Sequence, residues 1–220
     1  PKDYLTKSGF NQAKFYNDLN SDNRKLLGAE QLDWIEDRII NSSAVWTIFG
    51  QQVLMAKLKF PDISKMLKSK EIPSFLKPYL KFLGLGIPSN LDAWDGYPAE
   101  RNKLYKLMSN AKKGFVSLAG DTHNSWVSEL KDKSGSKVGI ELGTPSVTSP
   151  GITDVLNLDE KKFVESIVKI NNELKWMDPS NRGYLSLNCM EDKIIASFNY
   201  IKELVEINSD ISSTKSFVLH

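Results

Sequence analysis

The segment Phe115-Val-Ser-Leu-Ala-Gly-Asp-Thr-His-Asn-Ser-Trp126 decides how this chain folds. Its apolar first half predicts a buried strand, which ends abruptly at Gly120. Asp121 and His123 follow, and in an extended chain side chains at i and i+2 point to the same face. The segment therefore predicts a strand that presents a carboxylate and an imidazole to one site.

This carboxylate–imidazole pair is a candidate metal site. Open α/β sheets place their ligand sites at the ends of strands, and an Asp oxygen with a His nitrogen suits zinc, iron or manganese. The other interpretation is a purely structural histidine. The chain has only two histidines, whereas a catalytic metal needs at least three protein ligands. Any further ligands must be carboxylates, amides or tyrosines, or must come from another chain.

The elements around this segment alternate between helix and strand. Gly28 fits an N-cap for a helix that continues to Asn41, and Pro98 suits the first turn of another helix. We expect strands over 44–49, 115–119 and 138–142. Such an alternation is typical of an α/β layered sheet.

The last third of the chain predicts one helix followed by strands. Asp159 caps a helix with apolar residues on one face. Residues 183–190 and 193–200 alternate in hydrophobicity around an acidic turn, which predicts a hairpin. Residues 216–219 are expected to form a last edge strand.

Two regions depart from this regular pattern. Residues 1–23 are polar and are expected to be an irregular lead-in to a domain that covers 24–220. Residues 57–92 are basic and contain prolines that break any long helix. They are therefore predicted to be an insertion with one short helix near 74–83. This insertion is either a surface loop packed by its own side chains, or a lid or contact segment.

Other polar residues are candidates for substrate contacts. Gln51 and Gln52 follow a predicted strand, as Asp121 does, so they either contact a polar substrate or form a surface turn. Arg101 lies near a helix start, where an anion is favoured. The neighbouring Asp95 is predicted to cap this helix, and that role alone accounts for an aspartate at this position.

Composition excludes some classes of function. The net charge is +2 and the positive residues are scattered, which gives no electrostatic argument for nucleic acid. No apolar stretch approaches the roughly 18 residues of a transmembrane span. The start at Pro1 lacks an initiator Met and a signal-peptide pattern, so we expect a processed product or an excised piece. The single cysteine excludes an internal disulfide.

Several segments, taken in order, resemble one known family. They are Leu27-Gly-Ala-Glu-Gln-Leu-Asp-Trp34, Ala44-Val-Trp46, Gly50-Gln-Gln-Val53, Asp92-Ala-Trp-Asp-Gly-Tyr-Pro-Ala-Glu-Arg101, Gly120-Asp-Thr-His-Asn-Ser-Trp126, Gly143-Thr-Pro-Ser-Val-Thr-Ser-Pro-Gly151, Leu174-Lys-Trp176 and Arg182-Gly-Tyr184. Together they resemble the alkaline phosphatase D (PhoD) type of metallophosphatase and phosphodiesterase.

The resemblance implies a fold and a chemistry. The fold is the calcineurin-like four-layer α-β-β-α sandwich with a mixed sheet, and the chemistry is metal-dependent hydrolysis of phosphate mono- and diesters. The Gly-Asp-x-His segment resembles the family's last metal motif, which makes Asp121 and His123 metal ligands. Gln51, Gln52 and Arg101 become tentative substrate contacts. The family further implies calcium, in some cases iron, and a periplasmic or secreted location.

The family's opening half has no counterpart in these residues. We therefore expect the chain to be the C-terminal half of the enzyme, with an incomplete site that needs the N-terminal half for activity. Two alternatives stay open. One is a non-catalytic fragment that binds metal poorly, and the other is an anion-binding module that uses the 143–151 loop and helix termini.

Overall fold

The computed structural model describes residues 2–6, 9–63, 66–67, 87–88, 90–111, 114–202 and 210–220. Over these residues the chain is an α/β protein with a mixed sheet, as expected. The elements, in chain order, are a 3₁₀ turn at Lys2–Tyr4, β1 (Leu5–Thr6), β2 (Gly9–Phe10), α1 (Gln12–Leu19), α2 (Ala29–Ile40), β3 (Trp46–Gly50), a 3₁₀ turn at Trp94–Gly96, α4 (Pro98–Met108), β4 (Gly114–Ala119), β5 (Ser125–Lys131), β6 (Lys137–Gly143), α5 (Ile152–Leu156), α6 (Glu160–Ile170), β7 (Leu174–Asp178), β8 (Gly183–Cys189), β9 (Ile194–Ile201) and β10 (Ile211–Leu219).

The larger sheet has five strands in the order β3-β4-β6-β5-β7. β3, β4 and β6 run parallel, whereas β5 is antiparallel to both β6 and β7. The predicted strand over 115–119 is confirmed as β4, near the centre of this sheet. Its near-continuous apolar sequence is explained by burial on both faces.

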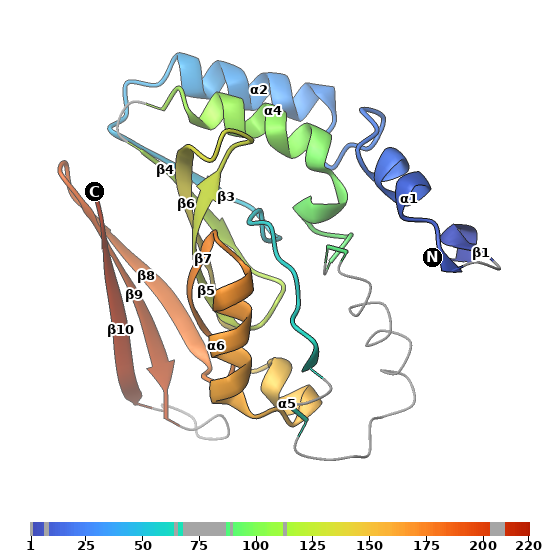
Figure 1. Cartoon of the computed structure of the whole chain (residues 1–220). Helices are drawn as coiled ribbons and strands as arrows, with labels where there is room; N and C mark the ends of the chain where they lie inside the picture. The colour runs from blue at the N-terminus through green and yellow to red at the C-terminus, as the bar shows by residue number, and fades with distance from the viewer. Residues whose placement is uncertain are drawn as a thin grey trace.

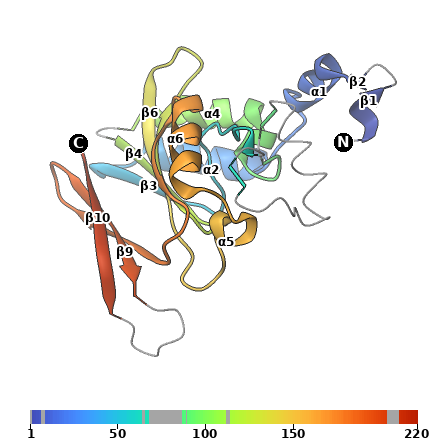
Figure 2. The ribbon, with the colours of Figure 1, turned by 60° about the horizontal axis from the view of Figure 1, so that its bottom comes forward.

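Alternate residues of β4 reach two different cores. Phe115 packs in the core formed with α2 and α4, whereas Val116 packs in the core formed with β9. The helices α2, α4 and α6 therefore cover one face of the larger sheet, and the three-stranded sheet β8–β10 covers the other (Figures 1 and 2). This arrangement is the α-β-β part of the expected sandwich.

The predicted hairpin is confirmed as β8 and β9, which pair antiparallel from Gly183 opposite Tyr200 to Cys189 opposite Ile194. The expected edge strand is confirmed as β10, which begins at Ile211 and so is longer than predicted. It pairs along nearly the whole of β9, and an edge strand extends wherever its neighbour offers unpaired backbone groups.

Three of the predicted helix starts are confirmed, and one predicted cap is wrong. Gly28 precedes α2, and the Asp159 carboxylate accepts a hydrogen bond from the Lys162 N–H at the start of α6. Pro98 is the first residue of α4, but Tyr97 rather than Asp95 occupies its N-cap position. Asp95 is buried and is used elsewhere, as described below.

The expectation of an irregular lead-in is wrong over Gln12–Leu19, which form α1. The Asn11 side chain caps this helix by accepting from the Lys14 N–H, and Phe15 and Leu19 are buried with Ile87. The two apolar residues are four apart, on one face of a helix, and the surrounding polar composition hid that pattern.

The predicted helix near 74–83 lies outside the described residues. At the near end of the predicted insertion, Leu58 and Ile63 are buried, so the chain has not yet left the protein interior there. Within the described ranges, every helix falls short of the length and apolar character needed to cross a bilayer.

Candidate functional site

Asp121 and His123 lie in a tight turn between β4 and β5. Their backbone φ angles are 68° and 58°, in the left-handed region. The predicted extended geometry is therefore wrong. β4 runs parallel to β6 but β5 runs antiparallel to it, so the chain must reverse direction between them. A reversing chain does not alternate its side chains as a strand does.

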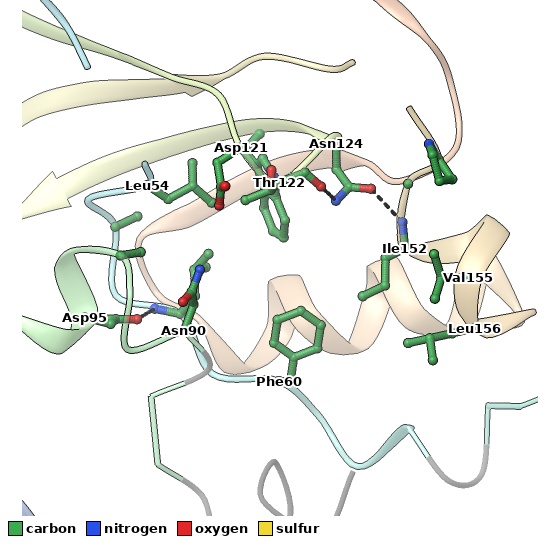
Figure 3. A pocket seen from close by; sticks show the side chains of 16 residues that line it. Leu54, Phe60, Asn90, Asp95, Asp121, Thr122, Asn124, Ile152, Val155 and Leu156 are labelled. Atoms are coloured by element: carbon green, nitrogen blue, oxygen red, sulfur yellow. Dashed lines mark hydrogen bonds between the residues drawn. The ribbon is translucent and has the colours of Figure 1, made fainter. Parts of the chain in front are cut away.

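The Asp121 carboxylate lines a cavity of about 450 Å³ (Figure 3). Asp121 is exposed, and within the described part of the chain its carboxylate has no hydrogen bond or ion pair. Its oxygens are therefore free to bind a cation or a donor group.

His123 does not line the cavity that Asp121 lines. Its Nδ1 lies 3.1 Å from the carbonyl oxygen of Pro150. A hydrogen bond from Nδ1–H to this carbonyl leaves Nε2 with its lone pair, which is the arrangement that metal-binding histidines commonly use. Among the described residues, no cluster of three or more His, Cys, Asp or Glu side chains is placed to hold a metal ion.

The cavity is bounded by an extended segment, by the turn after β4 and by α5 (Figure 3). The extended segment is residues 54–60, named the strap below. Apolar side chains make up most of the lining, and Asp121, Asn124, Asn90 and Asp95 are among the polar residues. The turn and α5 are tied together, since the Asn124 Oδ1 accepts a 3.1 Å hydrogen bond from the Ile152 N–H.

The strap belongs to no sheet, and side chains rather than strands bind its backbone N–H groups. Each acceptor is a buried residue distant in sequence. The N–H groups of Met55 and Ala56 donate to Glu141 at 2.7 and 2.9 Å, that of Lys57 to Glu173 at 2.9 Å, that of Leu58 to Asp95 at 3.0 Å, and that of Lys59 to Asn171 at 2.8 Å. Buried backbone N–H groups need partners, so these acceptors hold the cavity wall in place.

Glu141 is the most deeply buried of these acceptors, with no exposed surface. Burial raises the pKa of its carboxyl group to about 7, although the hydrogen bonds from Ala56, Met55 and Ser117 oppose the rise. A carboxyl group in this position changes charge near neutral pH, so the stability of the strap depends on pH.

Arg101 does not contact the cavity, and the predicted substrate contact is not supported. Its guanidinium is buried, pairs with Asp95 at 2.6 Å and donates to the Met55 carbonyl at 3.1 Å. Tyr105 donates to the same carbonyl at 3.0 Å. A buried charge requires a paired charge and hydrogen bonds. Asp95 and the Met55 carbonyl provide these for Arg101, so Arg101 stabilises the strap on the side away from the cavity.

The side chain of Gln51 points into the protein, whereas that of Gln52 is exposed. The Gln51 amide bonds to Val53, to Ser117 at 3.2 Å and to the Trp94 indole at 3.1 Å, which is a structural role. Gln52 is exposed at a shallow hollow where β3 and β4 end. Its backbone carbonyl accepts a 3.1 Å hydrogen bond from the Gly120 N–H, so Gln52 lies beside the turn that carries Asp121.

The strap is the part of the cavity wall that the sequence interpretation missed. Residues 57–60 were assigned to a basic, irregular insertion. Leu54, Ala56, Leu58 and Phe60 nevertheless recur at every second position and all line the cavity. That period of two was a usable signal for an extended segment with one apolar face.

Comparison with known proteins assigns the chain to a family. A family model described as PhoD-like phosphatase matches residues 2–198. The chain belongs to the PhoD-like phosphatase family. Alkaline phosphatase D of Bacillus subtilis (strain 168) is 28% identical over 201 residues, which cover 89% of this chain and 30% of that protein.

A solved structure described as "Structure of PhoD" has the same fold. It superposes with a TM-score of 0.66 at 26% identity, over 89% of this chain and 34% of that one. The resemblance to the PhoD family and the metallophosphatase-like sandwich are thereby confirmed. The chain spans about a third of the length of these relatives and corresponds to the C-terminal part of their domain.

Proposed function

We propose that this chain is the C-terminal part of a metal-dependent phosphatase that hydrolyses phosphate mono- and diesters. The observation that carries the proposal is the uncommitted carboxylate of Asp121, which faces a cavity beside the end of β4 in a chain of the PhoD-like family. Open sheets commonly bind ligands at such strand ends. Periplasmic or secreted location is part of the same proposal, and cell fractionation tests it.

The residues present fit part of a metal site. Asp121 offers free carboxylate oxygens, and the Pro150 contact leaves the Nε2 of His123 available. Carboxylate oxygen suits calcium, and the combination with imidazole suits iron. Metal bound there would supply positive charge against the phosphoryl oxygens of the substrate. Two ligands are fewer than a catalytic site needs, so the remainder would come from the N-terminal half.

The free edge of β3 is a suitable place for that half to attach. In the described part of the chain, β3 pairs on one side only, with β4. The Gln51 N–H donates toward β4, and N–H groups alternate along a strand, so the Ile48 N–H faces the free edge. A hollow of about 410 Å³ follows this edge and includes the exposed side chains of Trp34 and Ile48.

A strand of the N-terminal half that pairs in parallel at this edge would end near Gly50. The carboxyl ends of parallel strands meet at the same edge of a sheet, so its following residues would lie near Gln52 and the turn that carries Asp121. The proposed docking therefore brings the missing ligands to the side of the sheet where Asp121 lies.

The first test compares the isolated chain with the complete gene product. We expect hydrolysis of p-nitrophenyl phosphate and bis-p-nitrophenyl phosphate, with calcium and iron supplied, from the complete protein alone. The physical reason is the shortage of metal ligands in this half. Circular dichroism establishes that the isolated chain is folded, and addition of the separately expressed N-terminal half should restore activity. Equal activity from the isolated chain would refute the incomplete site.

Ile48→Pro tests the docking edge. Proline removes an N–H that has no partner among the described residues, so the isolated chain should lose less than about 1 kcal/mol of unfolding free energy. A strand paired at this edge would lose one hydrogen bond to β3 and would clash with the proline ring. Together these effects should cost about 3 kcal/mol or more of binding free energy. We therefore expect the variant to stop co-purification of separately expressed halves. Ile48→Val is the matched control, and equal capture by both variants would place the contact elsewhere.

A further inference from the structure

The cavity beside Asp121 has two apolar walls that face each other. Leu54, Ala56, Leu58 and Phe60 of the strap line the cavity, and so do Ile152 and Leu156 of α5. Figure 3 shows Leu54 and Phe60 across the cavity from Ile152 and Leu156. Buried side chains accept hydrogen bonds from the backbone N–H groups of the strap, so this wall of the cavity is held in a fixed position. The volume of about 450 Å³ is in the usual range for small-molecule sites.

The polar groups around the cavity are largely committed to the protein itself. The Trp126 indole donates to the Thr122 hydroxyl at 2.7 Å, and the Asn124 amide bonds to the carbonyl of Thr122 and the N–H of Ile152. Asp95 is neutralised by Arg101. Among the described lining residues, Asp121 is then the charged group whose oxygens are uncommitted.

This distribution of polarity selects one kind of ligand. A hydroxyl-rich group, such as a sugar or glycerol, loses its hydrogen bonds to water and meets few partners between apolar walls, which is unfavourable. An alkyl or aryl group meets surfaces that are equally apolar, and each methylene that it buries favours binding. The reacting end of the ligand belongs near Asp121, at the polar side of the cavity.

We infer that this cavity binds the apolar organic group of a soluble phosphate ester whose phosphoryl group lies beside Asp121. The inference rests on the proposed function and adds the substrate class. The strap and α5 are then the specificity-determining walls, and Val155, which also lines the cavity and is 46% exposed, stands at its accessible side.

The test uses the complete gene product and a series of p-nitrophenyl diesters with ethyl, butyl and octyl groups. In each diester the same bond breaks, since water adds to phosphorus and p-nitrophenolate leaves. We expect kcat/KM to rise about two- to fourfold for each methylene that the cavity accommodates. Val155→Asp, which places a charge against the alkyl chain, should lower the octyl-to-ethyl ratio of kcat/KM by about tenfold.

Val218→Asp is the matched control, because Val218 is 53% exposed on β10 and does not line this cavity. It should leave the octyl-to-ethyl ratio at the wild-type value. A ratio near one in the wild-type protein, or an equal fall in both variants, overturns the inference. Cleavage of phosphatidylglycerol in vesicles without cleavage of the soluble octyl ester overturns the assignment to soluble esters.

Calorimetric titration with ethyl- and octylphosphonate separates this inference from the proposed function. Tighter binding of octylphosphonate, weakened by Val155→Asp, supports the apolar subsite even if no ester is hydrolysed, in which case the proposed function fails alone. Hydrolysis without any chain-length dependence of kcat/KM or of affinity supports the proposed function and overturns the subsite.

Discussion

Asp121→Asn in the complete gene product is expected to lower kcat/KM for bis-p-nitrophenyl phosphate by about 100-fold or more. The variant keeps the size of the side chain but removes the negative charge that would hold a cation. Asp121 is exposed and makes no described hydrogen bond, so the fold should not change. Steady-state kinetics measures the loss, and calorimetric titration of calcium measures whether metal affinity falls with it.

Asp132→Asn is the matched control for this variant. Asp132 is a partly exposed carboxylate in the turn between β5 and β6, where its oxygen accepts hydrogen bonds from Ser134 and Ser136. An amide oxygen can accept the same bonds, so activity should stay within about twofold of wild type. Undiminished activity in Asp121→Asn, with metal affinity unchanged, would remove Asp121 from the proposed site.

Glu141→Ala is expected to lower the free energy of unfolding by about 2–6 kcal/mol near pH 5. The substitution leaves the buried N–H groups of Met55 and Ala56 without their acceptor, and each such group costs about 1–3 kcal/mol. The strap that forms the cavity wall should therefore loosen with the rest of the fold. Urea unfolding followed by tryptophan fluorescence measures the change.

The difference between wild type and Glu141→Ala should shrink as the pH rises. Burial raises the pKa of Glu141 to about 7 from its usual 4.5. A raised pKa means that the neutral carboxyl contributes its full stability below pH 4.5, and that this contribution is lost as the pH rises through about 7. The two limits differ by roughly 3 kcal/mol. Unfolding curves at pH 5, 6, 7 and 8 determine the slope.

Glu129→Ala is the control for this prediction. Glu129 lies on the neighbouring strand β5, is partly exposed, and pairs with Lys175 at 3.1 Å and Lys131 at 3.8 Å. Surface ion pairs contribute about 0–1 kcal/mol, so its loss should be small and should not follow the same pH dependence. Similar losses in both variants would mean that Glu141 does not hold the strap.

The secondary structure was largely predictable because its signals are local. The apolar run that became β4, the Gly28 and Asp159 helix starts and the 183–200 hairpin each depend on residues within about a dozen positions of one another. Side-chain periodicity and capping act over this distance, so the sequence contains the necessary information. The helix α1 was not predicted because five of its eight residues are polar or small, and only Phe15 and Leu19 are buried.

The roles of the charged residues were not predictable in the same way. Asp95 was taken for a helix cap and Arg101 for an anion contact, although both are buried and paired with each other behind the strap. Glu141 was not singled out. Their partners lie between 37 and 86 positions away along the chain, or become partners only after burial. No local pattern distinguishes a buried acceptor from a solvated carboxylate.

The Gly120–Trp126 segment shows the boundary between these two kinds of information. Its residues alone indicated a strand end followed by possible ligands, and together with the other motifs they indicated the family. The direction in which Asp121 and His123 point depends on the reversal between β4 and β5, which the antiparallel pairing of β5 with β6 imposes. Side-chain identity is a property of the sequence, whereas side-chain direction at a turn follows from how distant strands pair.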